Sequence, residues 1–369
     1  MSKLKDLQAH GQSIWIDYIK RSLLTTGELS RLIEDGLLGL TSNPSIFEKA
    51  IAESSEYRVD IAKLALSGMS TEEIYEQLAI ADIQAAADAF RSVYDATRGR
   101  DGYVSLEVSP ELARDTDATL SEARRLWKSV GRNNLMIKVP GTPEGLPAFE
   151  SLISEGINVN VTLLFSVPVY EEVATRYISG LTRRASAGHD ISRVSSVASF
   201  FVSRVDTAVD LILQTRLKNA TAQQQPILTS LLGKAAVANA KLAYQRYQAI
   251  FSGLDWKALQ SKGAQTQRVL WASTGTKNPA YSDLLYVEEL IGRDTVNTVP
   301  PATLEYFNEH GHIRDSLTED LRGARATVEA LALAGISMHD VTEALLDDGQ
   351  KQFVDAFRKL LAAVDKVRS

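Results

Sequence analysis

Eight short apolar segments alternate along this chain with longer stretches of helical periodicity. Such alternation is typical of strand–helix units that build a parallel sheet. The expected strands are SIWID (13–17), GLTSN (39–43), VSLEV (104–108), LMIKV (135–139), VNVTLL (159–164), SSVASFF (195–201), RVLWAS (268–273) and TVNTV (295–299). The clearest amphipathic stretches span residues 70–98, 115–130, 167–187 and 204–216. Eight units predict a closed (β/α)8 barrel, also called a TIM barrel.

The alternative is a doubly wound open sheet, but no glycine-rich dinucleotide fingerprint follows the first segment. A barrel of this kind accommodates all 369 residues, so we expect one domain over 1–369. Extra helical segments are expected at about 219–262 and 322–369, and residues 341–367 read as a helix packed outside the barrel. We interpret the polar stretch 218–226 as a surface loop.

Composition narrows the classes of function. The formal net charge of -6 argues against a general attraction to nucleic acid or anionic membranes. The chain has no cysteine, which excludes disulfides and thiolate chemistry. The polar first ten residues lack a signal-peptide core, and no run is long enough to span a bilayer, so we expect a cytoplasmic protein. His310 and His312 read as a polar loop, and no metal site is predicted.

Polar side chains gather at the ends of the expected strands. Residues two apart share a face of a strand, and the carboxyl ends of barrel strands carry active sites. The residues concerned are Asp17, Asn43, Glu107, Lys138, Asn160, Thr162, Ser199 and Ser273. The sequence therefore predicts one polar end of the barrel that contains a lysine and two carboxylates.

Each of these residues also has a structural interpretation. Asp17 is suited to cap the next helix, and Asn43 before Pro44 is typical of a turn. Glu107 and Lys138 would be ordinary if they were exposed at strand ends. Burying all the charged groups together is costly unless they are paired or functional, which favours the functional interpretation of the set.

The chemistry that this set supports is a Schiff base. A neutral lysine amine attacks a ketone, and the resulting iminium draws electrons from a neighbouring carbon–carbon bond. Asp17 and Glu107 are candidates for the proton transfers, and Asn43, Asn160 and Thr162 for holding hydroxyl groups. For a phosphate we expect Arg204 at a helix start and the loop 273–278, which includes Lys277. The loop 185–195 is a candidate cover for the pocket.

The chain resembles the transaldolase family over nearly its whole length. The resemblance lies in LTSNPSIF (40–47), VSLEV (104–108), NLMIKVPGTPEG (134–145), INVNVTLLFS (157–166), SFFVSRVD (199–206) and WASTGTKNP (271–279). It implies a (β/α)8 barrel of the class I aldolase type and the transfer of dihydroxyacetone from sedoheptulose 7-phosphate to glyceraldehyde 3-phosphate. The products would be erythrose 4-phosphate and fructose 6-phosphate, in the non-oxidative pentose phosphate pathway and without a cofactor.

The resemblance also implies residue roles. Lys138 matches the Schiff-base lysine, Asp17 the acid/base aspartate, Glu107 the glutamate that acts through a water, and Thr162 a residue that holds this water. The positions that match substrate contacts are Asn43, Asn160, Ser199 and Phe201 for the dihydroxyacetone part, and Arg204 and Ser273 for phosphate.

The chain departs from the family pattern at the phosphate end. Many members carry Ser-Pro-Phe-Val-Gly-Arg at 199–204 and Ser-Phe-Arg-Asn where this chain has 273–278, so a family arginine is missing. Lys277 is the candidate replacement, with the charge but without the bidentate fork. Rival functions are an aldolase that releases dihydroxyacetone and a sugar-phosphate-binding barrel without turnover. Glutamine at 107 and tyrosine at 201 would favour the aldolase, and the sequence does not predict an oligomeric state.

Overall fold

The computed structural model describes residues 2–52 and 54–368; residue 369, in the expected helical segment 322–369, lies outside them. Eight parallel strands form a closed barrel in the order of the sequence. The strands are β1 (Gln12–Asp17), β2 (Gly39–Thr41), β3 (Tyr103–Glu107), β4 (Leu135–Pro140), β5 (Val159–Leu164), β6 (Ser196–Phe201), β7 (Arg268–Ala272) and β8 (Thr295–Val299). The predicted (β/α)8 barrel is confirmed, and the open sheet is excluded.

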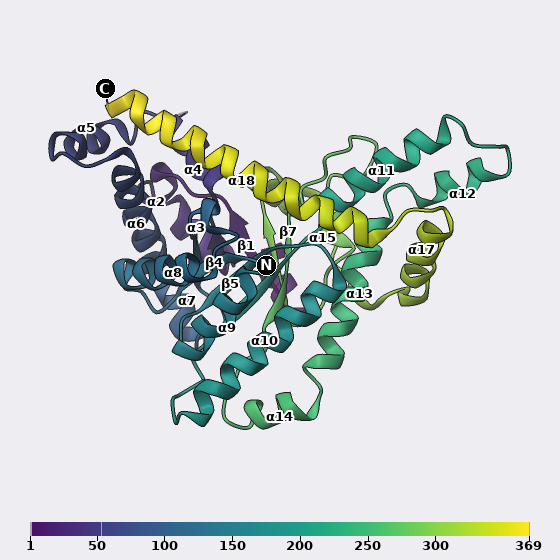
Figure 1. The fold of residues 1–369 in the computed structure, drawn as a ribbon, viewed down its shortest axis with the longest axis horizontal. Helices are drawn as coiled ribbons and strands as arrows, with labels where there is room; N and C mark the ends of the chain where they lie inside the picture. Colours follow the sequence, from purple (N-terminus) through teal and green to yellow (C-terminus); the bar gives the residue numbers. More distant parts are fainter. Residues whose placement is uncertain (1, 53, 369) are drawn as a thin grey trace.

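Helices surround the barrel, as Figure 1 shows. Those of the first half are α1 (Lys3–Ala9), α2 (Arg21–Thr25), α3 (Glu28–Asp35), α4 (Pro44–Ala52), α5 (Arg58–Leu66), α6 (Thr71–Ala89), α7 (Arg91–Ala96), α8 (Thr116–Val130) and α9 (Gly145–Glu155). Those of the second half are α10 (Val167–Ser186), α11 (Ser203–Leu217), α12 (Gln224–Leu231), α13 (Ala235–Ile250), α14 (Leu254–Gln260), α15 (Leu285–Glu288), α16 (Pro301–His310), α17 (Leu321–Leu333) and α18 (Met338–Arg368). Short 3-10 turns lie at Pro110–Leu112 and Ser316–Thr318.

The barrel interior is filled by side chains. Trp15 is fully buried, and a Cβ atom on Gly39 of the neighbouring strand would lie only 2.6 Å from its indole ring. The glycine thus leaves the space that the tryptophan fills. β4, β5 and β6 are buried along their whole length, as expected for strands covered on both faces.

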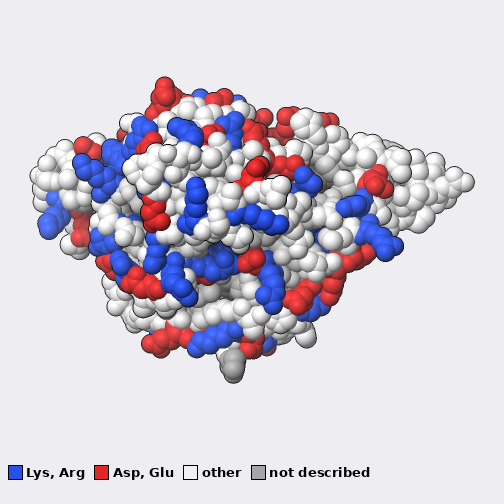
Figure 2. All heavy atoms as spheres, turned by 90° about the horizontal axis from the view of Figure 1, so that it is seen from below, with Lys and Arg blue, Asp and Glu red and all other residues white. Residues whose placement is uncertain are grey.

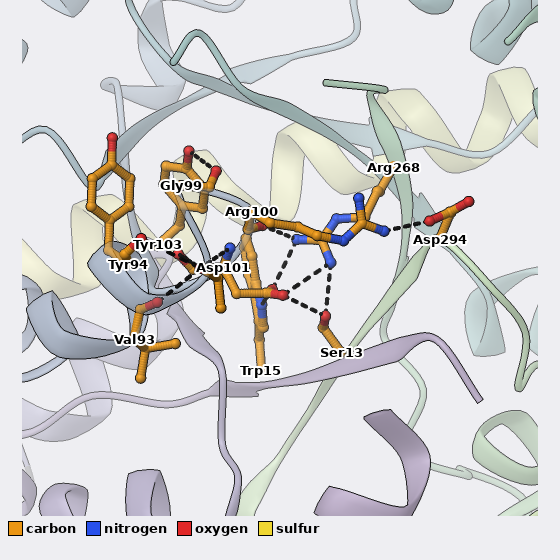
Figure 3. A network of polar contacts seen from close by, with 11 residues as sticks. Ser13, Trp15, Val93, Tyr94, Gly99, Arg100, Asp101, Tyr103, Arg268 and Asp294 are labelled. Atoms are coloured by element: carbon orange, nitrogen blue, oxygen red, sulfur yellow. Dashed lines mark hydrogen bonds and ion pairs between the residues drawn. The ribbon is translucent and has the colours of Figure 1, made fainter. Parts of the chain in front are cut away.

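The amino-terminal end of the barrel is closed by a buried ion pair (Figure 3). Arg268 on β7 and Asp101, just before β3, are each 4% exposed, and their Nη2 and Oδ1 atoms lie 2.9 Å apart. Ser13 and Trp15 of β1 donate further hydrogen bonds to the same carboxylate, at 2.9 and 3.1 Å. Figure 2, viewed from below Figure 1, shows basic and acidic side chains intermingled on the outer surface.

The structure corrects several helical assignments. The polar amino-terminal segment, for which no helix was predicted, forms α1. The stretch 70–98 is two helices, α6 and α7, separated at Phe90. The expected loop 218–226 is shorter than predicted and ends where α12 begins, at Gln224. Pro226 lies in the first turn of this helix, where a proline is tolerated.

Two segments lie elsewhere than expected. The loop 185–195 precedes β6, so it is at the amino-terminal end of the barrel and cannot cover a pocket at the carboxyl end. The last helix, α18, contacts α4, α6, α11 and β5 and thus crosses the carboxyl end, where it was expected on the outside (Figure 1). A Cβ atom on Gly349 would lie 2.9 Å from Leu163, so this glycine lets α18 approach β5 closely.

Candidate active site

A buried lysine lies at the carboxyl end of the barrel. Lys138 on β4 is 5% exposed, and its Nζ atom lies 3.2 Å from Glu107 Oε2 at the end of β3. The same amine donates a 3.0 Å hydrogen bond to the Ser42 carbonyl oxygen. Glu107 and Lys138 are direct partners in the β3–β4 register, so strand pairing brings them together. The interpretation of Lys138 as an exposed strand-end residue is wrong.

Glu107 is equally enclosed. Its side chain is 5% exposed, and among the described residues its Oε2 atom has no partner except Lys138. Burial raises the pKa of Glu107, although the Lys138 charge acts in the opposite direction. A carboxyl group with a raised pKa both accepts and returns a proton readily, which suits Glu107 to general acid–base catalysis.

Asp17 is the second carboxylate at this end. It does not cap α2, whose N-cap residue is Lys20, and its Oδ1 atom accepts a 2.7 Å hydrogen bond from Thr41. Asp17 is half-buried as a residue. Burial of its carboxyl group raises its pKa, and the charges of Lys138 and then Arg204 lower it. Two carboxyl groups with raised pKa values beside one buried amine are typical of proton-transfer sites.

The side chains of β5 and β6 next to Lys138 are polar and buried. Asn160, the register partner of Lys138, donates a 3.1 Å hydrogen bond to Ser105 and accepts one of 2.6 Å from Ser199. Thr162 is fully buried, and its hydroxyl has no hydrogen-bond partner within the described chain. The β5–β6 register shifts beside it, and Leu163 has a φ of 61°. Such irregularities recur at functional sites, where they redirect a side chain.

Asn43 combines both interpretations. Its Oδ1 atom accepts a 3.0 Å hydrogen bond from the Ile46 backbone at the start of α4, as expected of a turn or cap residue. The adjoining Ser42 carbonyl is the one that binds Lys138, so this turn also positions the lysine. A substrate contact by Asn43 stays a prediction.

The loops after β6 and β7 are joined to each other. The hydroxyls of Ser203 and Ser273 lie 3.0 Å apart, and the Ser203 backbone N–H donates to the Ser273 carbonyl at 3.1 Å. Ser273 has a φ of 55°, a left-handed conformation that is uncommon outside glycine. In TIM barrels the loops after the seventh and eighth strands often hold phosphate, and here the sixth and seventh supply the candidate groups.

Cations converge on these loops. The Arg204 guanidinium lies 5.3 Å from the Phe201 ring centre, and its Nη1 atom is buried without a hydrogen-bond partner among the described residues. Burial lowers the pKa of Arg204. Lys277 is an exposed residue, but partial burial of its amine, followed by the charges of Arg204 and Lys49, lowers its pKa. The structure therefore brings Lys277 into the electrostatic reach of Arg204 and Asp17.

Three contributors to this region were missed from the sequence. Phe353 of α18 lies over Lys138, with its ring centre 5.9 Å from Nζ. Lys49 of α4 adds a cation, and Ser42 contributes a backbone carbonyl. Backbone groups carry no sequence signal, and the contact of Phe353 depends on how α18 crosses the barrel.

The two neighbouring histidines each contact one carboxylate. His310 Nε2 lies 3.1 Å from Asp283 Oδ1, and His312 Nδ1 lies 3.4 Å from Glu288 Oε1. No group of three or more His, Cys, Asp or Glu side chains in the described ranges is placed to hold a metal ion. None of the helices within those ranges combines the length and apolar character needed to cross a bilayer.

Known proteins resemble this chain along its length. Residues 14–364 match the family model described as Transaldolase/Fructose-6-phosphate aldolase. A protein named Transaldolase from Trichodesmium erythraeum is 47% identical over 98% of this chain and 97% of its own length. Another from Thiobacillus denitrificans is 48% identical over 99% of this chain and 100% of its own, and one from Thermobifida fusca is 47% identical over 98% and 97%.

Proposed function

Because the chain belongs to the transaldolase/fructose-6-phosphate aldolase family, we propose that it transfers a dihydroxyacetone unit from sedoheptulose 7-phosphate to glyceraldehyde 3-phosphate. This is the activity of a transaldolase, the name that the relatives bear. The products are erythrose 4-phosphate and fructose 6-phosphate, which places the reaction in the non-oxidative pentose phosphate pathway. Cytoplasmic residence and a cofactor-free reaction are parts of the same proposal.

The observation that carries this proposal is the enclosed Lys138–Glu107 pair below α18, with Asp17 as a second carboxyl group. In the proposed mechanism Glu107 accepts a proton from Lys138, and the neutral amine then attacks the C2 ketone of the donor. The C2–oxygen bond then breaks and the oxygen leaves as water, with Glu107 moving protons through a water that Thr162 helps to hold.

Carbon–carbon cleavage is assigned to Asp17. Its carboxylate accepts the C4 hydroxyl proton while the C3–C4 bond electrons pass to the iminium, and the aldehyde product leaves. Addition of the acceptor aldehyde reverses these steps. Asn43, Asn160 and Ser199 are proposed to orient the dihydroxyacetone hydroxyls, and Phe201 to exclude water beside them.

The test compares transfer with release. Fructose 6-phosphate is supplied with or without erythrose 4-phosphate, and sedoheptulose 7-phosphate and free dihydroxyacetone are both quantified. We expect rapid transfer with the acceptor and only traces of dihydroxyacetone without it. Release at an equal rate in both reactions would identify an aldolase, and no product in either would favour a binding barrel.

Lys277 is proposed as a third phosphate contact and the second cation, together with Arg204 and Ser273. Lys277→Ala should raise KM for fructose 6-phosphate by about tenfold, since a charge-assisted hydrogen bond contributes roughly 1.5–3 kcal/mol. Lys277→Arg should retain the native value. Cleavage of fructose, which has no phosphate, is the matched control and should be unaffected in both variants; an equal loss with fructose would contradict a phosphate role.

The Asp17→Asn variant should be less active and more stable. Asn keeps the Thr41 hydrogen bond but cannot accept a proton, so turnover should fall by about 100-fold or more. Because burial raises the pKa of Asp17, the folded protein binds that proton more tightly than the unfolded chain. The ionised Asp17 carboxylate therefore lowers the free energy of unfolding at pH values above its pKa in the folded protein. This loss fades as the pH falls through that pKa.

Urea unfolding at several pH values measures this effect. The variant should have the higher midpoint at neutral pH, and the difference should shrink toward acidic pH. A native protein that is more stable than Asp17→Asn at neutral pH would show that the neighbouring cations outweigh burial.

A further inference from the structure

A cavity lies beside the candidate site, on the outer side of β3. It has a volume of about 310 Å³ and lies between α6, α8 and α18. Glu72, Glu111 and Arg125 in its lining are exposed, so the cavity opens to the protein surface, and Glu107 belongs to the same lining. A water molecule needs only about 10–15 Å³ of such space. The cavity therefore has room for several.

The lining disfavours the phosphorylated substrates. Besides Glu107, the cavity is lined by Glu72, Glu76, Glu111 and Glu122, against one arginine among the described residues. That residue, Arg125, pairs with both Glu76 and Glu122, and Arg358 of α18 pairs with Glu111. Four outer carboxylates thus face two arginines, and a negative excess remains. A mouth of one sign repels ions of the same sign. Entry of sugar phosphates is thus disfavoured, whereas neutral water is not repelled.

Tyr75 of α6 also lines this cavity. Its ring packs edge-on against Phe47 at 5.8 Å and against Phe357 at 5.7 Å, which fixes its orientation. Burial, followed by the charge of Glu107, raises the pKa of Tyr75, so its hydroxyl stays protonated. A protonated hydroxyl both donates and accepts hydrogen bonds, which suits it to pass a proton.

We propose that this cavity is a water and proton channel for Glu107, separate from the substrate opening, with Tyr75 of its lining as a positioning residue. This rests on the proposed Schiff-base function. Imine formation releases the C2 oxygen of the donor as water, and imine hydrolysis takes up water again. With Phe353 over Lys138 and substrate in the barrel mouth, the side channel lets that water exchange with solvent.

Oxygen exchange tests the channel. Fructose 6-phosphate is incubated with the enzyme in H₂¹⁸O, and ¹⁸O at C2 is measured by mass spectrometry, with Lys138→Met giving the uncatalysed background. Borohydride trapping in parallel samples measures imine formation. Ala79→Leu fills the channel from α6, and Ala330→Leu fills an unrelated pocket as the matched control. Exchange per trapped imine should fall by about tenfold in Ala79→Leu and stay native in the control.

An unchanged ratio in a folded Ala79→Leu would overturn the channel, as would an equal fall in the control. If Ala79→Leu does not fold, Tyr75→Phe decides, because it keeps the ring packing and removes only the hydroxyl; its ratio should also fall, and a native ratio would overturn the proposal. Absence of any trapped adduct in the native enzyme would instead refute the Schiff base. The two failures are therefore distinguishable.

Discussion

Lys138→Met is expected to form no covalent adduct with fructose 6-phosphate in the presence of borohydride, whereas the native chain gains the mass of a dihydroxyacetone unit. Borohydride reduces the iminium to a stable amine, so intact mass reports the bond directly. Methionine keeps the length and burial of the side chain but has no nucleophilic nitrogen. Turnover should fall by roughly 1,000-fold or more, as when a covalent nucleophile is removed.

A second buried lysine provides the control. Lys241 is 6% exposed, lies 3.6 Å from a Glu289 oxygen and donates a 3.1 Å hydrogen bond to the Glu319 carbonyl. Its burial and pairing resemble those of Lys138, but it lies on α13 outside the barrel mouth. Lys241→Met should therefore trap like the native chain. An adduct that persists in Lys138→Met and disappears in Lys241→Met would show that Lys241, and not Lys138, is the nucleophile.

Strand positions were predictable because a parallel barrel leaves a strong local signal. Strands buried on both faces read as short apolar runs, and β5 and β8 begin and end at the predicted residues. The alternation of side chains then predicted that Lys138, Glu107 and Asp17 face one end, and the register brings Lys138 opposite Glu107. The spacing of their backbones follows from strand pairing, which does not depend on side-chain detail.

Features that depend on tertiary packing were not predictable. Periodicity indicates that α18 is a helix, but the end of the barrel that it crosses is set by Gly349 and by contacts with α4 and β5. The prediction that the loop 185–195 covers the pocket was wrong, because a loop that precedes β6 lies at the amino-terminal end of the barrel. The contact between the Ser42 carbonyl and Lys138 forms only when distant segments meet. The same is true of the side cavity.

The buried Arg268–Asp101 pair was missed for the same reason. Arg268 begins the apolar run of β7, and Asp101 lies in a glycine-containing turn before β3, so each reads alone as an exposed strand-end charge. Closure of the barrel brings them together beside Trp15 (Figure 3). The carboxylate accepts hydrogen bonds from Ser13, Trp15 and Arg268, which compensates its removal from water.

Asp101→Ala is accordingly expected to lower the free energy of unfolding by about 3–5 kcal/mol, because it leaves a buried guanidinium without its counter-charge. Urea unfolding measures the loss. Asp294→Asn is the matched control, since Asp294 pairs with Arg100 in the same network but its side chain is 48% exposed, and its loss should be far smaller. Replacing both partners, as in Asp101→Leu with Arg268→Met, should recover most of the stability because no charge then remains buried. Equal losses in Asp101→Ala and Asp294→Asn would mean that water reaches the Arg268 guanidinium, and that the amino-terminal end of the barrel is open.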